Sequence, residues 1–384
     1  MNKLKVVYFL RDFSIVGGIE TVTSAKMNYL ATVDGVEVSV VYTSLGARNN
    51  IYKLNPNIKE YFLDFNEGEP YRHRFPVRLW YKRKQRAEIC MAVQRVVDEI
   101  QPDVIICNHH TFCDVKPLVT KAKLLYESHS ASNKLYLETG SRIPVFKLQY
   151  AWLKVWLRHW GIRRRVDCVV CLTHGDADDT WKGARRTEVI PNIVDYRPEV
   201  PYAADSKSVI IGGRLVSQKK MDDSILAWSI VHKKHPDWQL HIYGEGEYEG
   251  FLRSLIHEKG LDDVVFIHPF TSELYKRMQE SAVYLMSSMY EGFSLVIIEA
   301  MMNGLPVVSY NCPYGPADLI TDNGILVEHL NVGKLAEALC WMIEHPEERR
   351  HMGALGHKYA QQYLAESIMG KWLSLFTDLK KNIK

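Results

Sequence analysis

The stretch "YEGFSLVIIEAM" places Glu291 and Glu299 eight residues apart around a predicted helix start. A strand-like run, "AVYLMSS", precedes it, so we expect Glu291 in a loop and Glu299 roughly two turns into the helix. A carboxylate on an apolar helix face is costly unless it accepts hydrogen bonds, and vicinal hydroxyl groups are suitable donors. The first backbone N–H groups of the helix can hold a phosphate or sugar oxygen, and they belong to Phe293, Ser294 and Leu295.

Two cations and a pair of glycines could serve the same kind of ligand. In "IIGGRLVSQKKMDD", Arg214 follows a strand and two glycines, and Lys219 lies just before a helix. Such a pair suits a phosphate group, although two exposed surface charges remain an alternative. Gly17 and Gly18 occupy a predicted strand-to-helix turn, where a diphosphate could approach the backbone, or where they simply form a turn. The similar-looking loop "YGEGEYEG" is interpreted as a turn before a helix, because its glutamates would repel a pyrophosphate.

Three histidines follow predicted strands at their carboxyl ends. "PDVIICNHHTF" places His109 and His110 there, and "LLYESHSAS" does the same for His129. Ligands bind at these ends in open α/β sheets, so the three are candidates for the reaction, with a structural loop role as the alternative.

The elements that must position these residues alternate between strand-like and helix-like segments. Many strands are apolar at every position, which is typical of parallel strands covered on both faces. A proline-containing stretch near residues 191–208 interrupts the alternation, which then restarts. We therefore expect an α/β chain with two Rossmann-like, doubly wound domains facing across a cleft. The domains are predicted at 1–198 and 199–364, with a helix at 365–384 that returns to the N-terminal domain.

Composition narrows the functional classes. The 384 residues are 47% apolar and 24% charged, as in ordinary globular proteins, and seven irregularly spaced cysteines favour a reducing compartment. We find no segment with the length and apolarity of a membrane-spanning helix and no usual signal-peptide layout, so we expect a cytoplasmic protein. Cys168 and Cys171 lie in a strand-like run, where alternation sends the thiols to opposite faces and argues against metal or redox chemistry.

Taken in order, the motifs resemble those of GT-B glycosyltransferases, specifically the large, retaining GT4 family. They are "GGIE", "GGRLVSQKK", "EGFSLVIIEAM", "GLPVVS" and "NGILVE", and they span residues 17–328. Lys220 departs from the family pattern, which has glycine at that place. The resemblance implies transfer, with retention, of a hexose or N-acetylhexosamine from a nucleotide sugar, of which a UDP-sugar is favoured by "NCPYGPADLI". The acceptor would be a glycan or a lipid-linked saccharide of the cell surface.

The resemblance also implies the roles of the residues. Arg214 and Lys219 would hold the diphosphate, which Gly17 and Gly18 approach. Glu299 would bind the ribose, and Glu291 would contact the transferred hexose. A histidine after the first of the two strands would lie near the sugar and acceptor, and spacing does not decide between His109 and His110. We expect neither metal nor cofactor, since the basic pair and helix dipoles neutralise the leaving diphosphate.

Two strongly basic stretches require a partner of their own. Segments 70–87 and 139–166 each hold seven Lys or Arg and no acid, and Trp152, Trp156 and Trp160 repeat every four residues. Aromatic and basic helices of this kind lie at anionic membrane surfaces, so the inner leaflet is the expected partner. A core-facing aromatic stripe is the alternative, and nucleic acid is disfavoured because no nucleic-acid-binding module accompanies the charge.

Two other functions fit the same fold. One is a non-catalytic scaffold that binds a sugar nucleotide, against which the retained Glu291, Glu299, Arg214 and Lys219 count. The other is a nucleotide-sugar epimerase, which would interconvert sugars without an acceptor.

Overall fold

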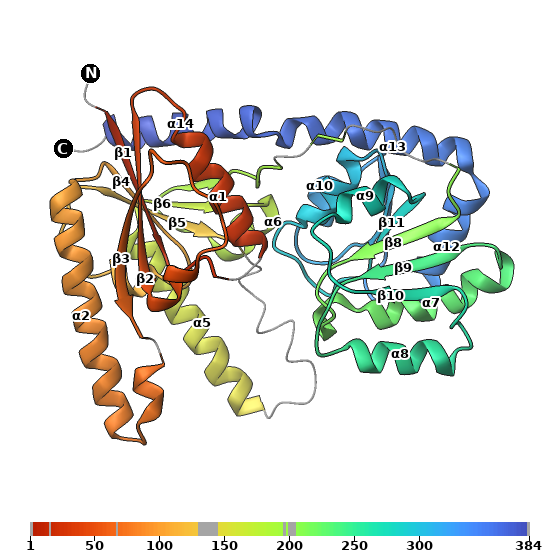
Figure 1. Ribbon diagram of the computed structural model, residues 1–384, viewed down its shortest axis with the longest axis horizontal. Helices are drawn as coiled ribbons and strands as arrows, with labels where there is room; N and C mark the ends of the chain where they lie inside the picture. The colour runs from red at the N-terminus through yellow and green to blue at the C-terminus, as the bar shows by residue number, and fades with distance from the viewer. Residues whose placement is uncertain are drawn as a thin grey trace. The chain divides into compact units, whose positions relative to one another are not determined.

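The computed structural model describes residues 3–14, 17–66, 68–129, 145–194, 197–198 and 205–381. The chain forms two compact units. The first comprises Met1–His129, Gln149–Ile193 and Ala365–Lys384, and the second is built mainly from Val194–Leu364. The first unit therefore combines the beginning and the end of the chain, which Figure 1 colours red and blue.

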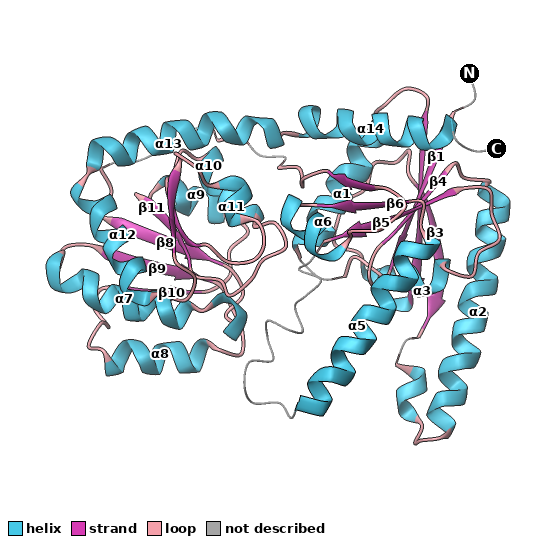
Figure 2. Ribbon diagram, turned by 180° about the vertical axis from the view of Figure 1, so that it is seen from behind, coloured by secondary structure: helices cyan, strands magenta, loops and turns pink. Residues whose placement is uncertain are grey.

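A parallel sheet forms the centre of the first unit, with the strand order β3-β2-β1-β4-β5-β6-β7 in the part of the chain that the structure describes. Both faces of the inner strands are buried because helices cover both sides of the sheet (Figure 2). The strands are β1 (Leu4–Leu10), β2 (Val36–Ser44), β3 (Lys59–Phe65), β4 (Val104–Cys107), β5 (Lys123–Ser128), β6 (Cys168–Cys171) and β7 (Thr187–Val189).

The last helix of the chain completes the first unit. This helix, α14 (Ala365–Lys381), contacts α1, β1 and β4, and buries Trp372 and Phe376. The other helices of the unit are α1 (Gly18–Leu30), α2 (Val77–Ile100), α3 (Phe112–Val115), α5 (Val145–Arg165) and α6 (His174–Thr180), with short 3-10 turns η1 (Leu45–Asn49) and η2 (Glu69–Arg72).

The second unit has a parallel sheet in the order β10-β9-β8-β11-β12-β13. Its strands are β8 (Ser208–Gly212), β9 (Gln239–Tyr243), β10 (Val265–His268), β11 (Val283–Met286), β12 (Val307–Tyr310) and β13 (Gly324–Val327). Its helices are α7 (Met221–Lys234), α8 (Glu249–Glu258), α9 (Leu274–Gln279), α10 (Leu295–Met302), α11 (Pro316–Leu319), α12 (Val332–Glu344) and α13 (Pro346–Ala360), with 3-10 turns η3 (Ser217–Lys219) and η4 (Gln361–Tyr363).

The expected fold class, two doubly wound parallel sheets, is confirmed. The loop around Gly246 leads into α8, as a turn before a helix should. A Cβ atom at Gly246 would lie 2.2 Å from the Leu215 carbonyl oxygen, so this glycine permits two backbone segments to pack directly. The predicted boundary at 198/199 borders residues 199–204, which lie outside the described residues. Across the helices that the structure describes, none has the length and apolarity needed to span a membrane.

Candidate active site

The loop between β11 and α10 ends in an open helix N-terminus. Ser294 is the residue before the helix, with φ 63° and ψ 67°, and its side chain makes no capping hydrogen bond. Ser294 therefore supplies no side-chain acceptor to the first turn of α10, and Leu295 is the one residue of the predicted group 293–295 that belongs to the helix. Gly315 lies against this loop with φ +102°, and a Cβ atom there would be 2.8 Å from the Phe293 carbonyl oxygen. Only glycine suits that position, because both the dihedral angle and the close approach exclude a side chain.

Glu299 is partly buried in α10 and its carboxylate has no hydrogen-bond partner among the described residues. The helix begins at Leu295, so Glu299 lies about one turn into it, and the prediction of two turns was wrong. Burial raises the pKa of Glu299 above its ordinary value. Tyr284 of β11 lies nearby, and its hydroxyl donates to the Gly212 carbonyl at the end of β8 over 3.2 Å. A carboxylate at this place can accept hydrogen bonds from a ligand.

Lys219 and Glu291 form an ion pair, with 2.7 Å between Nζ and Oε1. Their side chains are only 18% and 11% exposed. Backbone contacts hold both in place: the Ser287 hydroxyl donates to the Lys219 carbonyl, and the Glu291 N–H donates to the Pro313 carbonyl over 2.7 Å. The sequence assigned these two residues to different parts of a ligand, and the structure brings them into direct contact.

Arg214 is exposed just after the end of β8, and its guanidinium group forms no hydrogen bond or ion pair with a described residue. Lys219 lies close by, since a Cβ atom at Gly213 would be 3.5 Å from Lys219 Cε. Because β8 and β11 are neighbours in the sheet, Arg214 and the β11–α10 loop share the carboxyl edge of one sheet. A free guanidinium, an ammonium and open helix N–H groups together make a site for an anion such as a diphosphate.

Lys220 stands where glycine was expected from the family pattern, and its backbone explains the preference. Its φ of 47° and ψ of 39° are left-handed, a conformation that glycine adopts without strain. The Lys220 ammonium lies 2.8 Å from Asp222 Oδ2 and 3.0 Å from Asp223 Oδ1 in the first turn of α7. These ion pairs help to hold Lys220 in this conformation, and its single positive charge offsets half of the charge of the two carboxylates.

In the first unit, the candidate residues lie at the carboxyl ends of β1, β4 and β5, which are adjacent in the sheet. Gly17 precedes α1 in an extended conformation, and its N–H donates to the Tyr52 hydroxyl over 3.2 Å. His109 and His110 are exposed, with ring centroids 5.2 Å apart. Arg158 of α5 lies 2.8 Å from His109 Nε2 and also donates to the His109 carbonyl.

His129 has a different environment from the other two histidines. Its side chain is 6% exposed, and its Nε2 lies 2.7 Å from Glu127 Oε2. Glu127 also pairs with Lys26, a residue of α1. Sequence reasoning missed Lys26, Glu127 and Arg158, because contacts over such separations leave no local pattern.

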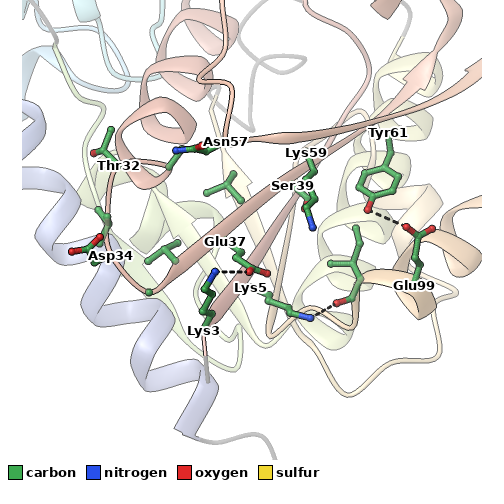
Figure 3. Close-up of a pocket in the computed structure, with 16 residues that line it drawn as sticks. Lys3, Lys5, Thr32, Asp34, Glu37, Ser39, Asn57, Lys59, Tyr61 and Glu99 are labelled. Atoms are coloured by element: carbon green, nitrogen blue, oxygen red, sulfur yellow. Dashed lines mark hydrogen bonds and ion pairs between the residues drawn. The ribbon is translucent and has the colours of Figure 1, made fainter. Parts of the chain in front are cut away.

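A hollow at the opposite edge of the first sheet does not contain any predicted site residue (Figure 3). It lies where β1, β2 and β3 begin, and several of its polar side chains bond to other residues that line it. Lys3 contacts Glu37 at 3.0 Å, and Lys5 Nζ donates to the Ile100 carbonyl. The Tyr61 hydroxyl donates to Glu99 over 3.2 Å. We therefore assign no substrate to this hollow.

No group of three or more His, Cys, Asp or Glu side chains is arranged to hold a metal ion within the described ranges. Asp176 is buried and bonded to Ser128 and Trp181, and Asp223 accepts from Tyr310, so both acids have structural partners.

Two family models match consecutive parts of the chain, which together extend over residues 16–359. "Glycosyltransferase Family 4" matches residues 16–197, and "Glycosyl transferases group 1" matches residues 194–359. The chain belongs to the group 1, family 4 glycosyltransferases. It is thus an enzyme of a glycosyl-transferring family, and its two parallel sheets are those of the GT-B fold.

The chain also resembles individual glycosyltransferases, over most of its length or over about half of it. An uncharacterized glycosyltransferase of Haemophilus influenzae is 26% identical over 382 residues, covering 96% of this chain and 98% of that protein. A poly(ribitol-phosphate) alpha-N-acetylglucosaminyltransferase of Staphylococcus aureus is 33% identical over 190 residues, 49% of this chain and 38% of that protein. The chain thus matches well under half of the latter. Among solved structures, TarM has a TM-score of 0.77 at 18% identity, covering 97% of this chain and 98% of TarM, which shows the shared fold.

Proposed function

We propose that this glycosyltransferase moves a hexose or N-acetylhexosamine from a UDP-sugar to an acceptor of bacterial cell-surface polysaccharide synthesis, with retention at the anomeric carbon. The observation that carries the proposal is the partly buried carboxylate of Glu299, which has no partner among the described residues and lies in the helix that follows β11. The exposed Arg214 follows the neighbouring strand β8 at the same edge of the sheet. A nucleoside diphosphate would satisfy both kinds of group. Its ribose hydroxyls can donate to the carboxylate, and its diphosphate carries negative charge for the cations and the helix N-terminus. The S. aureus relative, named for transfer of N-acetylglucosamine to poly(ribitol phosphate), supports the class of acceptor.

The ion pair between Lys219 and Glu291 fits a shared role. An ammonium group has three donors, so Lys219 can hold Glu291 Oε1 and a diphosphate oxygen at the same time. The second oxygen of Glu291 then remains for a hydroxyl of the transferred hexose. Arg214 and Lys219 stabilise the leaving diphosphate, whose oxygen accepts the proton of the incoming hydroxyl on the same face of the sugar. In this mechanism His109, His110 and His129 serve the sugar and acceptor from the first unit, and Gly17 and Gly18 leave room for the phosphates.

Groups of the protein itself can balance the negative charge of a UDP-sugar donor. The cations and helix N–H groups supply the positive charge that a diphosphate leaving group requires, so we propose a metal-independent reaction without a cofactor. A TarM mutant was solved in complex with UDP, fondaparinux and alpha-GlcNAc-glycerol, which supports UDP as the nucleotide and a glycan as partner.

The experiment that tests the proposal is incubation with radiolabelled UDP- and GDP-sugars, with and without saccharide and polyol-phosphate acceptors. Transfer from a UDP-sugar to an acceptor, with the donor's anomeric configuration kept in the product, supports the proposal. Interconversion of sugars without acceptor would instead identify an epimerase. Binding of UDP without turnover would identify the scaffold that the sequence left open.

We also propose that the transferase works at the cytoplasmic face of the membrane, through an aromatic–basic surface of the first unit. The exposed aromatic residues of this surface are Tyr71, Phe75, Trp80, Tyr150, Trp152, Trp156 and Trp160. The lower ends of α2 and α5 both extend past the sheet in Figures 1 and 2. These residues belong to η2, the loop between η2 and α2, the start of α2, and α5. Residues 139–144 of the predicted basic segment lie outside the described residues.

The exposures argue against the core-facing stripe that the sequence allowed. Trp152, Trp156 and Trp160 are 59%, 43% and 45% exposed. The Lys84 ammonium lies over the Trp80 ring and the Lys154 ammonium over the Tyr150 ring, which brings cations beside the rings. Exposed aromatic rings beside cations suit the headgroup region of an anionic bilayer.

Not every cation of the segment belongs to this surface. Arg163 donates to the Thr180 carbonyl over 2.6 Å, and Arg165 donates to the carbonyls of Lys116 and Leu118 over 2.7 Å. These two arginines connect α5 to the rest of the unit, so they are poor choices for testing membrane binding.

The better variants are Trp80→Ala, Trp152→Ala and Lys84→Glu, which change exposed side chains. Sedimentation with vesicles containing phosphatidylserine should show binding by the unaltered chain, weaker binding by the variants and weaker binding at high salt. Equal binding by all chains would refute the membrane proposal.

A further inference from the structure

A buried ionic network lies at the carboxyl end of β5, inside the first unit. Glu127 Oε2 accepts hydrogen bonds from Lys26 Nζ at 2.6 Å and from His129 Nε2 at 2.7 Å. The three side chains are 2%, 5% and 6% exposed, in the order Lys26, Glu127, His129. Trp372 of α14 covers the network, since the Lys26 ammonium lies 4.4 Å from the centroid of its ring.

Glu127 stays ionised in this network although burial disfavours a charged carboxylate. Burial alone would raise the pKa of Glu127, but the Lys26 ammonium and the His129 hydrogen bond outweigh it and hold the pKa at about 2. Glu127 is therefore ionised at neutral pH. Apolar residues of similar volume often stabilise a fold at least as well as a buried ion pair, so stability does not explain why these charges are here.

The carboxylate determines how the imidazole of His129 is used. Because Nε2 faces an acceptor-only oxygen, the ring must carry a hydrogen on Nε2. The other nitrogen, Nδ1, is buried and has no hydrogen-bond partner in the part of the chain that the structure describes. The hydroxyls of Tyr8 and Thr23 are also buried without partners, and both residues line one small hollow together with His129 and Asn108.

We propose that Glu127 is a positioning residue of the transferase site. It fixes His129 in the tautomer with hydrogen on Nε2 and so presents Nδ1 as an acceptor, while Lys26 keeps Glu127 ionised. The hydrogen bond that Nδ1 accepts comes from an alcoholic hydroxyl of a bound saccharide. The proposal rests on the proposed function, because it places His129 at the saccharide. A carboxylate that orients a functional histidine through its other ring nitrogen is a recurrent arrangement in enzyme sites.

Removing only one partner would leave a buried charge unpaired, so the test uses paired variants. K26M/E127L replaces the ion pair with apolar side chains and removes the acceptor for Nε2. K26M/E127Q also removes the charges but keeps an amide oxygen that can accept from Nε2. The matched control is K380M/D103N, which removes the 2.8 Å ion pair between α14 and the residue before β4, at the opposite edge of the same sheet.

With the UDP-sugar that the unaltered enzyme uses, K26M/E127L should lower kcat by about 10- to 100-fold. Its KM for the donor should change little, because the nucleotide contacts lie in the second unit. K26M/E127Q should recover part of the loss, and K380M/D103N should keep the unaltered kcat. A folded K26M/E127L enzyme with unchanged kcat would overturn the proposal, and so would K26M/E127Q with no recovery.

Nitrogen NMR of chain labelled with 15N-histidine tests the tautomer without any activity. The His129 signal, assigned from its loss in His129→Gln, should show hydrogen on Nε2 and lose this preference in K26M/E127L. A neutral ring with hydrogen on Nδ1 in the unaltered chain would overturn the proposal. Full transferase activity in His129→Gln would also overturn it and leave the proposed function standing. If no nucleotide sugar supports transfer, the proposed function fails, and the NMR result alone decides whether Glu127 positions His129.

Discussion

Replacing Glu299 should stabilise the unliganded protein while it weakens binding of the donor. The carboxylate is partly buried, has no partner among the described residues, and has a pKa that burial raises above 4.5. Leaving a buried polar group unsatisfied costs about 1–3 kcal/mol, and more when it is charged. Glu299→Gln should therefore raise the free energy of unfolding by about 1 kcal/mol or more at neutral pH.

The gain should depend on pH in a defined direction. Between pH 4.5 and the raised pKa, the folded chain keeps a proton that the unfolded chain releases, so stability falls as the pH rises through this window. The advantage of Glu299→Gln should grow across the same window and level off above it. Urea unfolding at several pH values measures this difference. Glu348→Gln, at an exposed position early in α13, is the matched control and should change stability by no more than about 0.5 kcal/mol.

The loss on the ligand side follows from the same carboxylate. One hydrogen bond to a charged group contributes about 1.5–3 kcal/mol, which corresponds to roughly a 10- to 150-fold weaker Kd for UDP in Glu299→Gln. Isothermal titration calorimetry measures it. Loss of stability without ligand, together with an unchanged Kd for UDP, would refute the assignment of this residue to a ligand.

Three further predictions concern other parts of the chain. Glu291→Gln should lower kcat at least about tenfold and also weaken donor binding, because Lys219 loses the partner that orients it; steady-state kinetics and titration with UDP measure both. Ionised Glu127 should contribute about 3 kcal/mol of stability that is lost as the pH falls from 4.5 to about 2, as urea unfolding in acid will show. Gly246→Val should destabilise the second unit by about 1–3 kcal/mol or more in urea unfolding, whereas Gly250→Ala, where a Cβ atom meets open space, should not.

Each of these has a clear contrary result. Unchanged donor binding in Glu291→Gln would show that Lys219 does not need Glu291 to hold the donor. If the free energy of unfolding falls as steeply between pH 4.5 and about 2 in K26M/E127L as in the unaltered chain, Glu127 does not supply that stability. Equal stability of Gly246→Val and the unaltered chain would show that the backbone contact at this loop can relax.

The sequence predicted what depends on periodicity and on local geometry. Strands that are apolar at every position had to be buried on both faces, and this gave both sheets. The strand-like run before "YEGFSLVIIEAM" also predicted a loop followed by a helix, and β11 and α10 confirm this order. The position of Glu299 within the helix was wrong by about one turn, because only four residues separate it from Leu295, where α10 begins.

Contacts between distant segments could not be predicted in the same way. Lys26 and Glu127 are 101 residues apart, and Lys219 and Glu291 are 72 apart, so nothing in either local pattern identifies the partner. Two basic residues of α5 were likewise interpreted without their distant partners. Arg163 and Arg158 read as surface charges, but they donate to the Thr180 carbonyl and to His109, since the shape of the fold brings those groups within reach.

The return of α14 to the first unit determines the order in which this protein can fold during synthesis. Domains generally fold as they leave the ribosome, the N-terminal one first. Here the N-terminal unit waits for Ala365–Lys381, which are translated after all of the second unit. Until Trp372 arrives, Lys26 and the face of α1 that α14 covers are open to solvent and to chaperones. The second unit is therefore the first that can be completed, and a ribosome that stalls before α14 is translated would release a chain whose first unit is still unfinished.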